Sequence, residues 1–310
     1  RVLWNSIQAL QRRYSFVQCV VYTGDRGASA DEILAKVQQR FGLYLANNVQ
    51  FVYLRLRCAV EAHRWPRFTL LGQSLGSMLL GLEALLKFCP NVYIDSMGYA
   101  FTLPLFRWIG GCKTASYVHY PVVSQDMLEK VSEQVSSFNN PSWISRSKIL
   151  TKFKIIYYKL FAKIYGFAGR RNDVIMVNSS WTHGHIERIW KPKKVYIVYP
   201  PCDTSTFQQL PLDHKSRSLR IISVGQFRPE KDHKMQIRVL QRLLTALSRK
   251  QRQGVMLVLV GSCRNSEDQA RVEELKQYAK QLGVGDRVLF RINVSYQELQ
   301  DELCQASVAI

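Results

Sequence analysis

Residues 220–233 read RIISVGQFRPEKDH, a short apolar run that ends at a glycine and passes into a charged helix start. Two further apolar runs follow at 255–260 and 287–292. The stretches between these runs keep apolar residues at helical spacing: Ile237, Leu240, Leu244 and Leu247 in the first, and Val272, Leu275, Ala279 and Leu282 in the second. Strands that alternate with helices predict βαβ units and a parallel sheet of the nucleotide-binding type.

The first two thirds of the chain show the same alternation. Short apolar runs that predict strands occupy residues 17–22, 92–94, 115–119, 174–178 and 195–198. Pro200, Pro201 and the polar stretch 211–220 separate this part from the second block of strands, as a linker does. We therefore predict an α/β protein with two Rossmann-like domains, residues 1–203 and 204–310.

Composition and charge narrow the class of protein. The chain has 310 residues, 47% of them hydrophobic and 21% charged, which fits two folded domains rather than long disordered tracts. The formal net charge of +20 suits an anionic partner. Nucleic acid is rejected as that partner, because the cations are spread along the chain and no RNP, KH or zinc-finger pattern occurs. Seven cysteines without a CxxC pair indicate reduced thiols in contact with cytosol, not a disulfide framework or zinc site.

Both ends of the sequence suggest that the chain is cut. Apolar residues recur at helical spacing over residues 2–14, with no Met start and no N-cap ahead of them. Residues 307–310 follow a helical run and have the composition of a strand that is just beginning. We expect truncation on both sides.

For two long apolar segments the sequence allows both a membrane environment and a protein core. Residues 68–88 are long enough for a membrane span, but Gln73, Glu83 and the Ser/Gly breaks favour a buried helix of the first domain. The helix expected over 148–171 has a lysine stripe (Lys148, Lys152, Lys159, Lys163) beside an apolar face (Ile149, Phe153, Ile156, Leu160, Ile164, Phe167). Such a helix fits a membrane interface, and it fits equally a core helix whose lysines cover a solvated edge.

A candidate anion site lies in the second block. Gly225 allows close backbone approach, Arg228 offers a planar fork of donors and Lys231 a point charge, all at the start of a helix whose dipole favours an anion. Gly261 ends the next strand at the same edge of the sheet, where open α/β sheets bind ligands. These residues fit a diphosphate, although ordinary surface turns have the same composition.

The first block offers two candidates. His119 closes a strand before Pro121, which leaves the imidazole at the carboxyl end of the sheet, and Asp95 ends the preceding strand. The alternatives are a structural histidine and an aspartate that caps a helix. No GxSxG elbow or GxxxxGK[ST] loop occurs, so neither a serine hydrolase nor an NTPase is indicated. No DxD pair or other hard-metal spacing occurs, so protein cations rather than Mg²⁺ would neutralise a diphosphate.

Seven motifs carry a family resemblance that covers essentially the whole chain. They are YTGD (22–25), FTLLGQSLGS (68–77), YIDSMGYAFTLPLF (93–106), SYVHYP (116–121), VNSSWT (177–182), VYPPCD (198–203) and SVGQFRPEKDH (223–233). On these motifs the chain resembles the retaining, sugar-nucleotide-dependent GT-B glycosyltransferases. Within them it is most similar to the α-1,2-mannosyltransferases that extend the dolichol-linked N-glycan precursor.

The resemblance implies two Rossmann-like domains that face a cleft. The first would hold a dolichyl-pyrophosphate-linked oligosaccharide as acceptor, with Asp95 and His119 on its side, and the second would hold GDP-mannose. Arg228 and Lys231 would clamp the donor diphosphate as catalytic groups, with Gly225 and Gly261 in the same donor site and no metal or other cofactor. His119 would lie beside the transferring sugar, and a phosphate oxygen would take the proton of the attacking hydroxyl.

The resemblance also implies a place and partners. It places the protein at the endoplasmic reticulum membrane, on the cytosolic face, with the membrane surface and other mannosyltransferases of the pathway as partners. Three parts of the family are expected outside this sequence: a glycine-rich turn and a membrane anchor before Arg1, and a paired-glutamate motif after Ile310. The second domain is therefore expected to be incomplete, and a non-catalytic module that binds a membrane or a partner protein is the alternative function.

Overall fold

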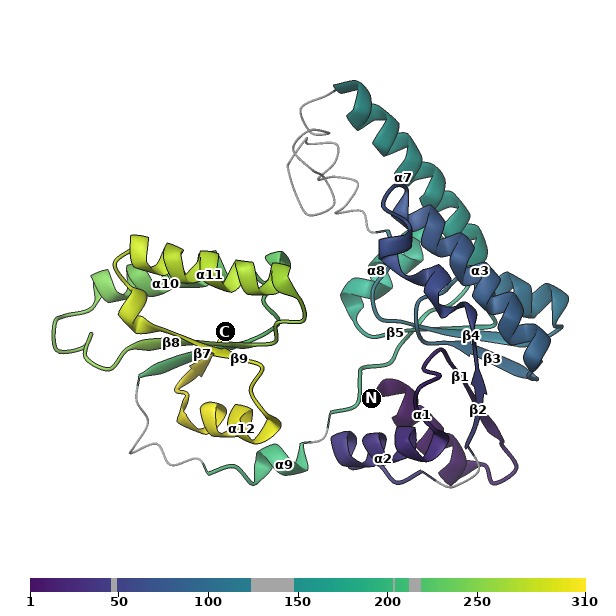
Figure 1. Cartoon of the computed structure of the whole chain (residues 1–310), viewed down its shortest axis with the longest axis horizontal. Coiled ribbons are helices and arrows are strands. Elements are labelled where there is room, and N and C mark those ends of the chain that lie inside the picture. The colour runs from purple at the N-terminus through teal and green to yellow at the C-terminus, as the bar shows by residue number, and fades with distance from the viewer. Residues whose placement is uncertain (46–48, 124–147, 203, 212–218) are drawn as a thin grey trace. The chain divides into compact units, whose positions relative to one another are not determined.

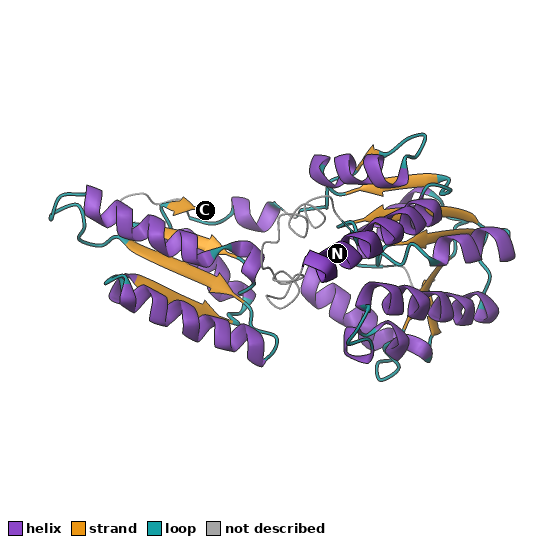
Figure 2. Cartoon of the chain, turned by 90° about the horizontal axis from the view of Figure 1, so that it is seen from above, coloured by secondary structure: helices purple, strands orange, loops and turns teal. Residues whose placement is uncertain are grey.

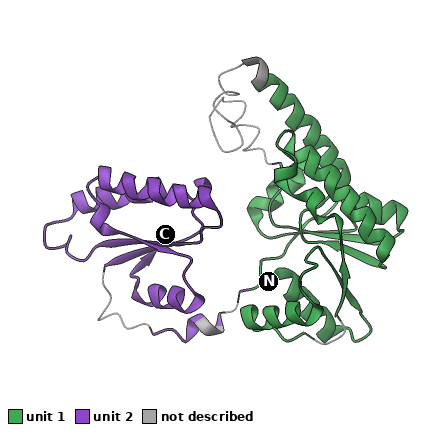
Figure 3. Cartoon of the chain, in the orientation of Figure 1, with its two compact units in different colours: residues 1–201 green, residues 202–310 purple. Residues whose placement is uncertain are grey.

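The computed structural model describes residues 1–45, 49–123, 148–202, 204–211 and 219–310. These residues form two compact units, Arg1–Pro201 and Cys202–Ile310, shown in Figure 3. The predicted domain boundary lies two residues beyond this division. Part of the predicted linker, residues 212–218, lies outside the described residues, as does Asp203 of the VYPPCD motif.

Unit 2 is a parallel sheet with helices on both faces. Its strands β7 (Arg220–Val224), β8 (Met256–Gly261), β9 (Val288–Ile292) and β10 (Val308–Ala309) are ordered β10-β7-β8-β9. Helices α10 (His233–Ala246) and α11 (Ser266–Gln281) cover one face and α12 (Tyr296–Gln305) the other, as Figure 1 shows. The short α9 (Ser205–Gln208), η4 (Pro229–Lys231) and η5 (Gly285–Arg287) complete the unit. The predicted alternation of strands and helices after residue 220 is confirmed.

Alternate residues of β8 point to opposite faces of the sheet and contribute to the core on each face. Leu257 and Leu259 pack with Ile237 of α10 and Val272 of α11. Val258 and its neighbours on that side pack instead toward the residues of α12. A strand buried on both faces reads as a continuous apolar run, which is why the sequence alone located it so closely.

Unit 1 contains two parallel sheets. Strands β1 (Cys19–Thr23) and β2 (Val49–Tyr53) form a pair, and β3 (Val92–Asp95), β4 (Lys113–Val118), β5 (Val174–Val177) and β6 (Tyr196–Ile197) form a sheet in that order. The longer helices are α1 (Val2–Arg13), α2 (Ala30–Phe41), α3 (Thr69–Lys87), α7 (Lys148–Gly169) and α8 (Ser180–Trp190), seen from above in Figure 2. The short α4 (Thr102–Pro104), η1 (Leu56–Val60), η2 (Ala62–Arg64) and η3 (Leu105–Ile109) lie between them in the chain.

Helix α3 buries its small residues together with Leu80 and Leu85, and it exposes five other leucines. Gly72 and Gly76 allow the close approach of Trp65 and of the Ala59 carbonyl, which a Cβ atom on either glycine would meet. The outward leucines are between 39% and 79% exposed: Leu71, Leu75, Leu79, Leu82 and Leu86. The prediction of a buried helix therefore holds for one face only. Among the described residues α3 is also the one helix long and apolar enough to cross a membrane, and 44% of that stretch is buried.

Helix α7 exposes the apolar face that the sequence outlined. Phe153, Ile156, Leu160, Ile164 and Phe167 are between 44% and 67% exposed. A different set faces the interior, with Phe161 and Tyr165 in the core beside Trp190 of α8. Of the two predicted environments, the core-helix interpretation is wrong for this face. The side chains of Lys148 and Ile149 lie outside the described residues.

Candidate functional site

In unit 2 the candidate site begins where β7 ends. The Gly225 N–H donates to the Val260 carbonyl at 2.9 Å, which ties the turn to the neighbouring strand β8. The chain then passes through Arg228 into η4 and reaches Asp232, whose backbone is left-handed at φ 43°. The Asp232 carboxylate accepts from the Met235 N–H at 3.3 Å and so caps α10. The predicted strand, turn and helix start are all present at this edge.

Arg228 is a half-buried cation with free donor capacity. Its Nη1 lies 3.6 Å from an oxygen of the exposed Glu230, a long and solvent-screened pair. Its Nε is buried and has no hydrogen-bond partner within the part of the chain that the structure describes. An unpaired buried N–H is unfavourable unless an acceptor arrives. The guanidinium is thus suited to receive oxygens of a bound anion.

Lys231 lies close to the glycine turn. A Cβ atom on Gly225 would be 3.5 Å from both Cδ and Cε of Lys231, so the lysine stem runs along the turn. Lys231 is exposed and forms no ion pair with any described residue. Burial, followed by the charges of Lys231 and Arg271, lowers the pKa of the buried His233 at the start of α10. The histidine is therefore neutral at pH 7 and adds no charge to the site.

Gly261 brings β8 against this turn. A Cβ atom there would collide with the Gly225 carbonyl oxygen and lie 3.0 Å from the Phe227 ring. The structure thus gathers Gly225, Arg228, Lys231 and Gly261 at the carboxyl ends of β7 and β8.

Sequence reasoning overlooked the loop that follows β8. Cys263 donates its N–H to Asn293 Oδ1 at 2.9 Å, and Arg264 Nε donates to Asp268 Oδ2 at 3.0 Å. Asn265 caps α11 by accepting from the Asp268 N–H at 3.0 Å. The same loop therefore presents a second arginine and a second helix start at this edge. Its sequence signal was the run Gly261–Arg264 itself, in which only the glycine was singled out.

In unit 1 Asp95 has a structural role. It is buried at the end of β3, and its Oδ1 accepts from the Met97 N–H at 3.0 Å. Further hydrogen bonds come from the Gly98 and Tyr99 backbones, but desolvation dominates and raises the pKa of this carboxyl. The carboxylate shapes the turn after β3, which is close to the capping alternative left open by the sequence.

His119 is exposed at the end of β4 and touches the same turn. Burial of its ring lowers its pKa, and a hydrogen bond to the Ser96 backbone acts in the opposite direction. Its carbonyl oxygen lies 3.4 Å from Thr182 Oγ1 of α8, and its ring lies 4.8 Å from that of Tyr117. The structure therefore brings the His119 side chain to the loop that Asp95 shapes, with the imidazole neutral at pH 7.

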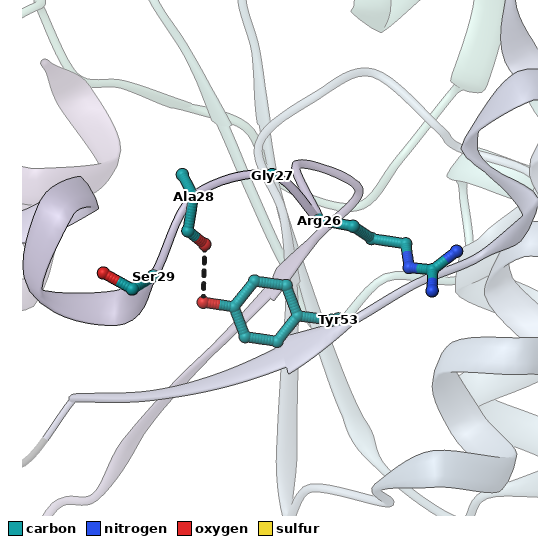
Figure 4. A pocket seen from close by; sticks show the side chains of 5 residues that line it. All are labelled: Arg26, Gly27, Ala28, Ser29 and Tyr53. Atoms are coloured by element: carbon teal, nitrogen blue, oxygen red, sulfur yellow. Dashed lines mark hydrogen bonds between the residues drawn. The ribbon is translucent and has the colours of Figure 1, made fainter.

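A hollow of about 370 Å³ lies elsewhere in unit 1, at the carboxyl ends of β1 and β2. Figure 4 shows the Tyr53 hydroxyl donating to the Ala28 carbonyl at the hollow, a hydrogen bond of 3.0 Å, while the Arg26 side chain points away from them. Arg26, Gly27 and Ser29 complete the lining. No residue singled out as a site residue from the sequence lines this hollow.

Comparison with known proteins adds the family. A sequence family described as "ALG11 mannosyltransferase N-terminus" matches residues 1–190, more than half of the chain. The chain belongs to the ALG11 mannosyltransferase family. Residues 205–310 of this family member match a second family, described as "Glycosyl transferases group 1". The glycosyltransferase family predicted from the sequence motifs is confirmed.

Named relatives of this ALG11 family member are similar over its whole length. A mouse protein named GDP-Man:Man(3)GlcNAc(2)-PP-Dol alpha-1,2-mannosyltransferase is 50% identical over 100% of this chain and 64% of its own length. A Caenorhabditis elegans protein of the same name is 43% identical, over 100% of this chain and 67% of its own. The chain thus spans about two thirds of the length of these relatives.

A solved structure supports the fold of this family member independently. A UDP-forming α,α-trehalose-phosphate synthase from Burkholderia vietnamiensis has a TM-score of 0.61 and 13% identity, over 94% of this chain and 76% of that one. At that identity the likeness concerns the fold alone. The predicted α/β fold of the GT-B type is confirmed.

Proposed function

We propose that this protein transfers mannose from GDP-mannose to a dolichyl-pyrophosphate-linked oligomannose in α-1,2 linkage. The observation that carries the proposal is the 50% identity over 100% of this chain to a relative whose name states that donor, acceptor and linkage. Both units of the chain are covered by that match. The arrangement of charges in each unit agrees with the proposal.

Unit 2 fits the donor. GDP carries adjacent phosphates, and Arg228 with Lys231 offers a guanidinium and an ammonium beside a glycine turn and a helix start. As the bond between mannose and GDP breaks, negative charge grows on the diphosphate. Cations that are already in position stabilise that charge without rearrangement, which lowers the barrier. We assign the donor diphosphate to this edge of the sheet.

Unit 1 fits the acceptor. His119 is an exposed, neutral imidazole at pH 7, so one of its ring nitrogens can donate to a sugar hydroxyl and the other can accept. The Asp95 carboxylate is buried against backbone N–H groups and acts as a positioning group for the turn that His119 touches. We therefore propose that His119 contacts sugar and that Asp95 does not.

The test is a transfer assay. Protein extended to the length of its relatives is incubated with radiolabelled GDP-mannose and Man3GlcNAc2 linked by pyrophosphate to dolichol. We expect labelled lipid-linked product from which an α-1,2-mannosidase releases the label. Product that resists this enzyme, or label that enters only with a different sugar nucleotide, contradicts the proposed reaction.

The proposal includes a membrane surface, because α3 exposes leucines while its polar side chains form hydrogen bonds within the protein. A helix on the surface of a water-soluble protein normally has its polar side chains outside. Glu83 accepts from the N–H groups of Arg55 and Leu56 at 2.7 and 2.8 Å, and Gln73 donates to the Val60 carbonyl at 2.8 Å. The polar side chains of Gln73 and Glu83 thus bond within the protein, while five leucines of the helix are exposed and Leu80 and Leu85 are buried. Helices in contact with lipid have this arrangement.

Helix α7 adds a second apolar face beside α3. The two helices meet where Tyr157 of α7 accepts from the Leu71 N–H at 3.2 Å. Trp108, 52% exposed, has its ring 5.9 Å from that of Phe167, and Arg171 lies over both rings. Exposed Lys152, Lys159 and Lys163 accompany the apolar residues of α7. Aromatic and basic groups beside an apolar face are typical of the interface between lipid tails and headgroups.

We propose that the outward residues of α3 and α7, with Trp108, rest on a membrane whose headgroups carry negative charge. The apolar residues would enter the boundary of the acyl layer, and the lysines would remain at headgroup level. An acceptor anchored by dolichol is held in such a bilayer. We assign this membrane to the endoplasmic reticulum and the protein to its cytosolic face.

A further inference from the structure

Two stacked aromatic rings, one of them on the residue that follows His119, are exposed at the edge of the sheet. Tyr120 follows the histidine at the carboxyl end of β4, and Trp181 opens α8 directly after β5. Their ring centroids are 5.0 Å apart with an interplanar angle of 28°, and the residues are 58% and 42% exposed. Large aromatic residues normally bury their faces in a core or an interface. This pair instead presents apolar surface to solvent at the edge of the sheet where ligands bind.

Neighbouring residues hold this aromatic pair in place. The indole of Trp181 lies 4.2 Å from the ring of His185, which is buried. Ser179 caps α8 by accepting from the Thr182 N–H at 3.2 Å. Thr182 Oγ1 in turn donates to Asn178 Oδ1 at 2.7 Å and approaches the His119 carbonyl at 3.4 Å. The segment that carries Tyr120 and the helix that carries Trp181 are thereby held in one position before any ligand arrives.

The chemistry of such a surface is that of sugar recognition. A hexopyranose has a face of C–H groups that packs on an aromatic ring and a rim of hydroxyl groups that needs hydrogen-bond partners. Tyr120 supplies the ring, and the neutral imidazole of His119, the preceding residue in the chain, can donate to or accept from a hydroxyl. Rigid rings lose little conformational entropy on binding, which suits weak, repeated contacts with sugars.

We infer that Tyr120 and Trp181 form a stacking subsite for one hexopyranose ring of the acceptor oligosaccharide. This inference rests on the proposed function, and it assigns part of the acceptor to named side chains of unit 1. The subsite fixes the orientation of the acceptor sugar next to His119. Its residues are specificity-determining rather than catalytic, since they hold the sugar without taking part in the transfer.

The first test measures transfer kinetics with Tyr120→Leu, Trp181→Leu and Trp181→Phe, and with Tyr44→Leu as the matched control, because Tyr44 is 73% exposed elsewhere in unit 1. Loss of stacking should raise the KM for the lipid-linked acceptor about three- to tenfold. The KM for GDP-mannose and kcat should stay within twofold, the phenylalanine variant should stay close to wild type, and so should the control. An unchanged acceptor KM in both leucine variants overturns the subsite, as does a selective rise in the KM for GDP-mannose, which would assign the rings to the nucleotide.

A second test needs no transfer. Free Man3GlcNAc2 is added to the 310-residue chain, and saturation is transferred from aromatic protons of the protein to glycan protons by NMR. We expect transfer to the C–H protons of a mannose ring, and its loss in Tyr120→Leu but not in Tyr44→Leu. Absence of transfer with the wild-type chain overturns the subsite even where mannosyl transfer is normal. Transfer that is present in a protein without mannosyltransferase activity keeps the subsite and rejects the proposed reaction.

Discussion

Gly261 lies so close to Gly225 that a Cβ atom on Gly261 would collide with the Gly225 carbonyl oxygen. The contact joins the end of β8 to the turn after β7, at the edge that carries Arg228 and Lys231. A Cβ atom on Gly225 meets no such obstacle, because it would lie at an ordinary van der Waals distance, 3.5 Å, from the Lys231 stem. Neither glycine has a positive φ. The two glycines therefore differ in what they permit.

We predict that Gly261→Ala destabilises unit 2 and that Gly225→Ala does not. Overpacking against backbone that cannot move aside should lower the free energy of unfolding by about 1–3 kcal/mol. Gly225→Ala should change it by less than about 0.5 kcal/mol. Urea unfolding followed by circular dichroism gives both values. Equal effects of the two alanines would show that the close approach at Gly261 does not determine the fold of this edge.

Lys231 and Lys234 provide a matched pair for the donor site. Both are lysines near the start of α10, but Lys234 pairs with Glu274 of α11 while Lys231 lies along the glycine turn. Loss of a charge-assisted hydrogen bond to phosphate is worth about 1.5–3 kcal/mol. Lys231→Ala, and likewise Arg228→Ala, should weaken GDP binding about ten- to a hundredfold by calorimetry, whereas Lys234→Ala should leave it within twofold. Similar losses of GDP affinity in Lys231→Ala and Lys234→Ala would mean that overall charge, and not the position of Lys231, determines GDP binding.

Mannose transfer should not require a divalent ion. The sequence contains no DxD pair, and two protein cations lie at the edge assigned to the diphosphate. We predict that excess EDTA leaves the rate of transfer within about twofold of that with added Mg²⁺ or Mn²⁺. Loss of activity in EDTA, restored by one of these ions, would show that the two cations do not suffice.

The sequence was most informative where strands are buried on both faces. Strand β8 (256–261) is a continuous run of apolar residues, and the sequence placed it at 255–260, within one residue of its observed bounds. Strand β2, VQFVY at 49–53, was missed because Gln50 interrupts its apolar run. Its partner β1, of the same length and in the same two-stranded sheet, begins with the unbroken apolar run CVVY and was predicted.

Helix environments were harder to predict than helix positions. The apolar residues of α3 and α7 were located correctly, but periodicity gives a face and does not say what medium covers it. In α3 the glycines determine the packed face, since their lack of side chains allows η1 to approach. In unit 2 the motifs placed Gly225, Arg228 and Lys231 at one edge of the sheet, as the structure does, and in unit 1 they placed His119 at the end of β4. The sequence could not show that Asp95 turns inward, because that depends on three backbone N–H groups brought together by the fold.

His233 should make the stability of unit 2 depend on pH. Its pKa in the folded chain is lowered by burial from an ordinary value near 6.5, so the unfolded chain binds the proton more readily. The stabilising effect of keeping His233 neutral is complete above pH 6.5 and is lost as the pH falls toward the folded-state pKa. We predict a falling free energy of unfolding between pH 7 and 5 and a shallower fall in His233→Phe. An equally steep fall in His233→Phe would show that His233 does not cause the pH dependence.

Binding to vesicles should depend on the outward face of α7. Ile156 and Leu160 are 61% and 57% exposed, and burial of most of either side chain in lipid is worth about 1 kcal/mol. In flotation with vesicles of phosphatidylcholine and phosphatidylserine, Ile156→Ser and Leu160→Ser should each lower the bound fraction, and the double variant should lower the partition coefficient about tenfold or more. Val239→Ser, at a half-exposed apolar position of α10 in unit 2, should bind as wild type does. Because all three positions are exposed, circular dichroism should show an unchanged fold. Equal binding by the double variant and the Val239 control would mean that α7 does not touch the bilayer.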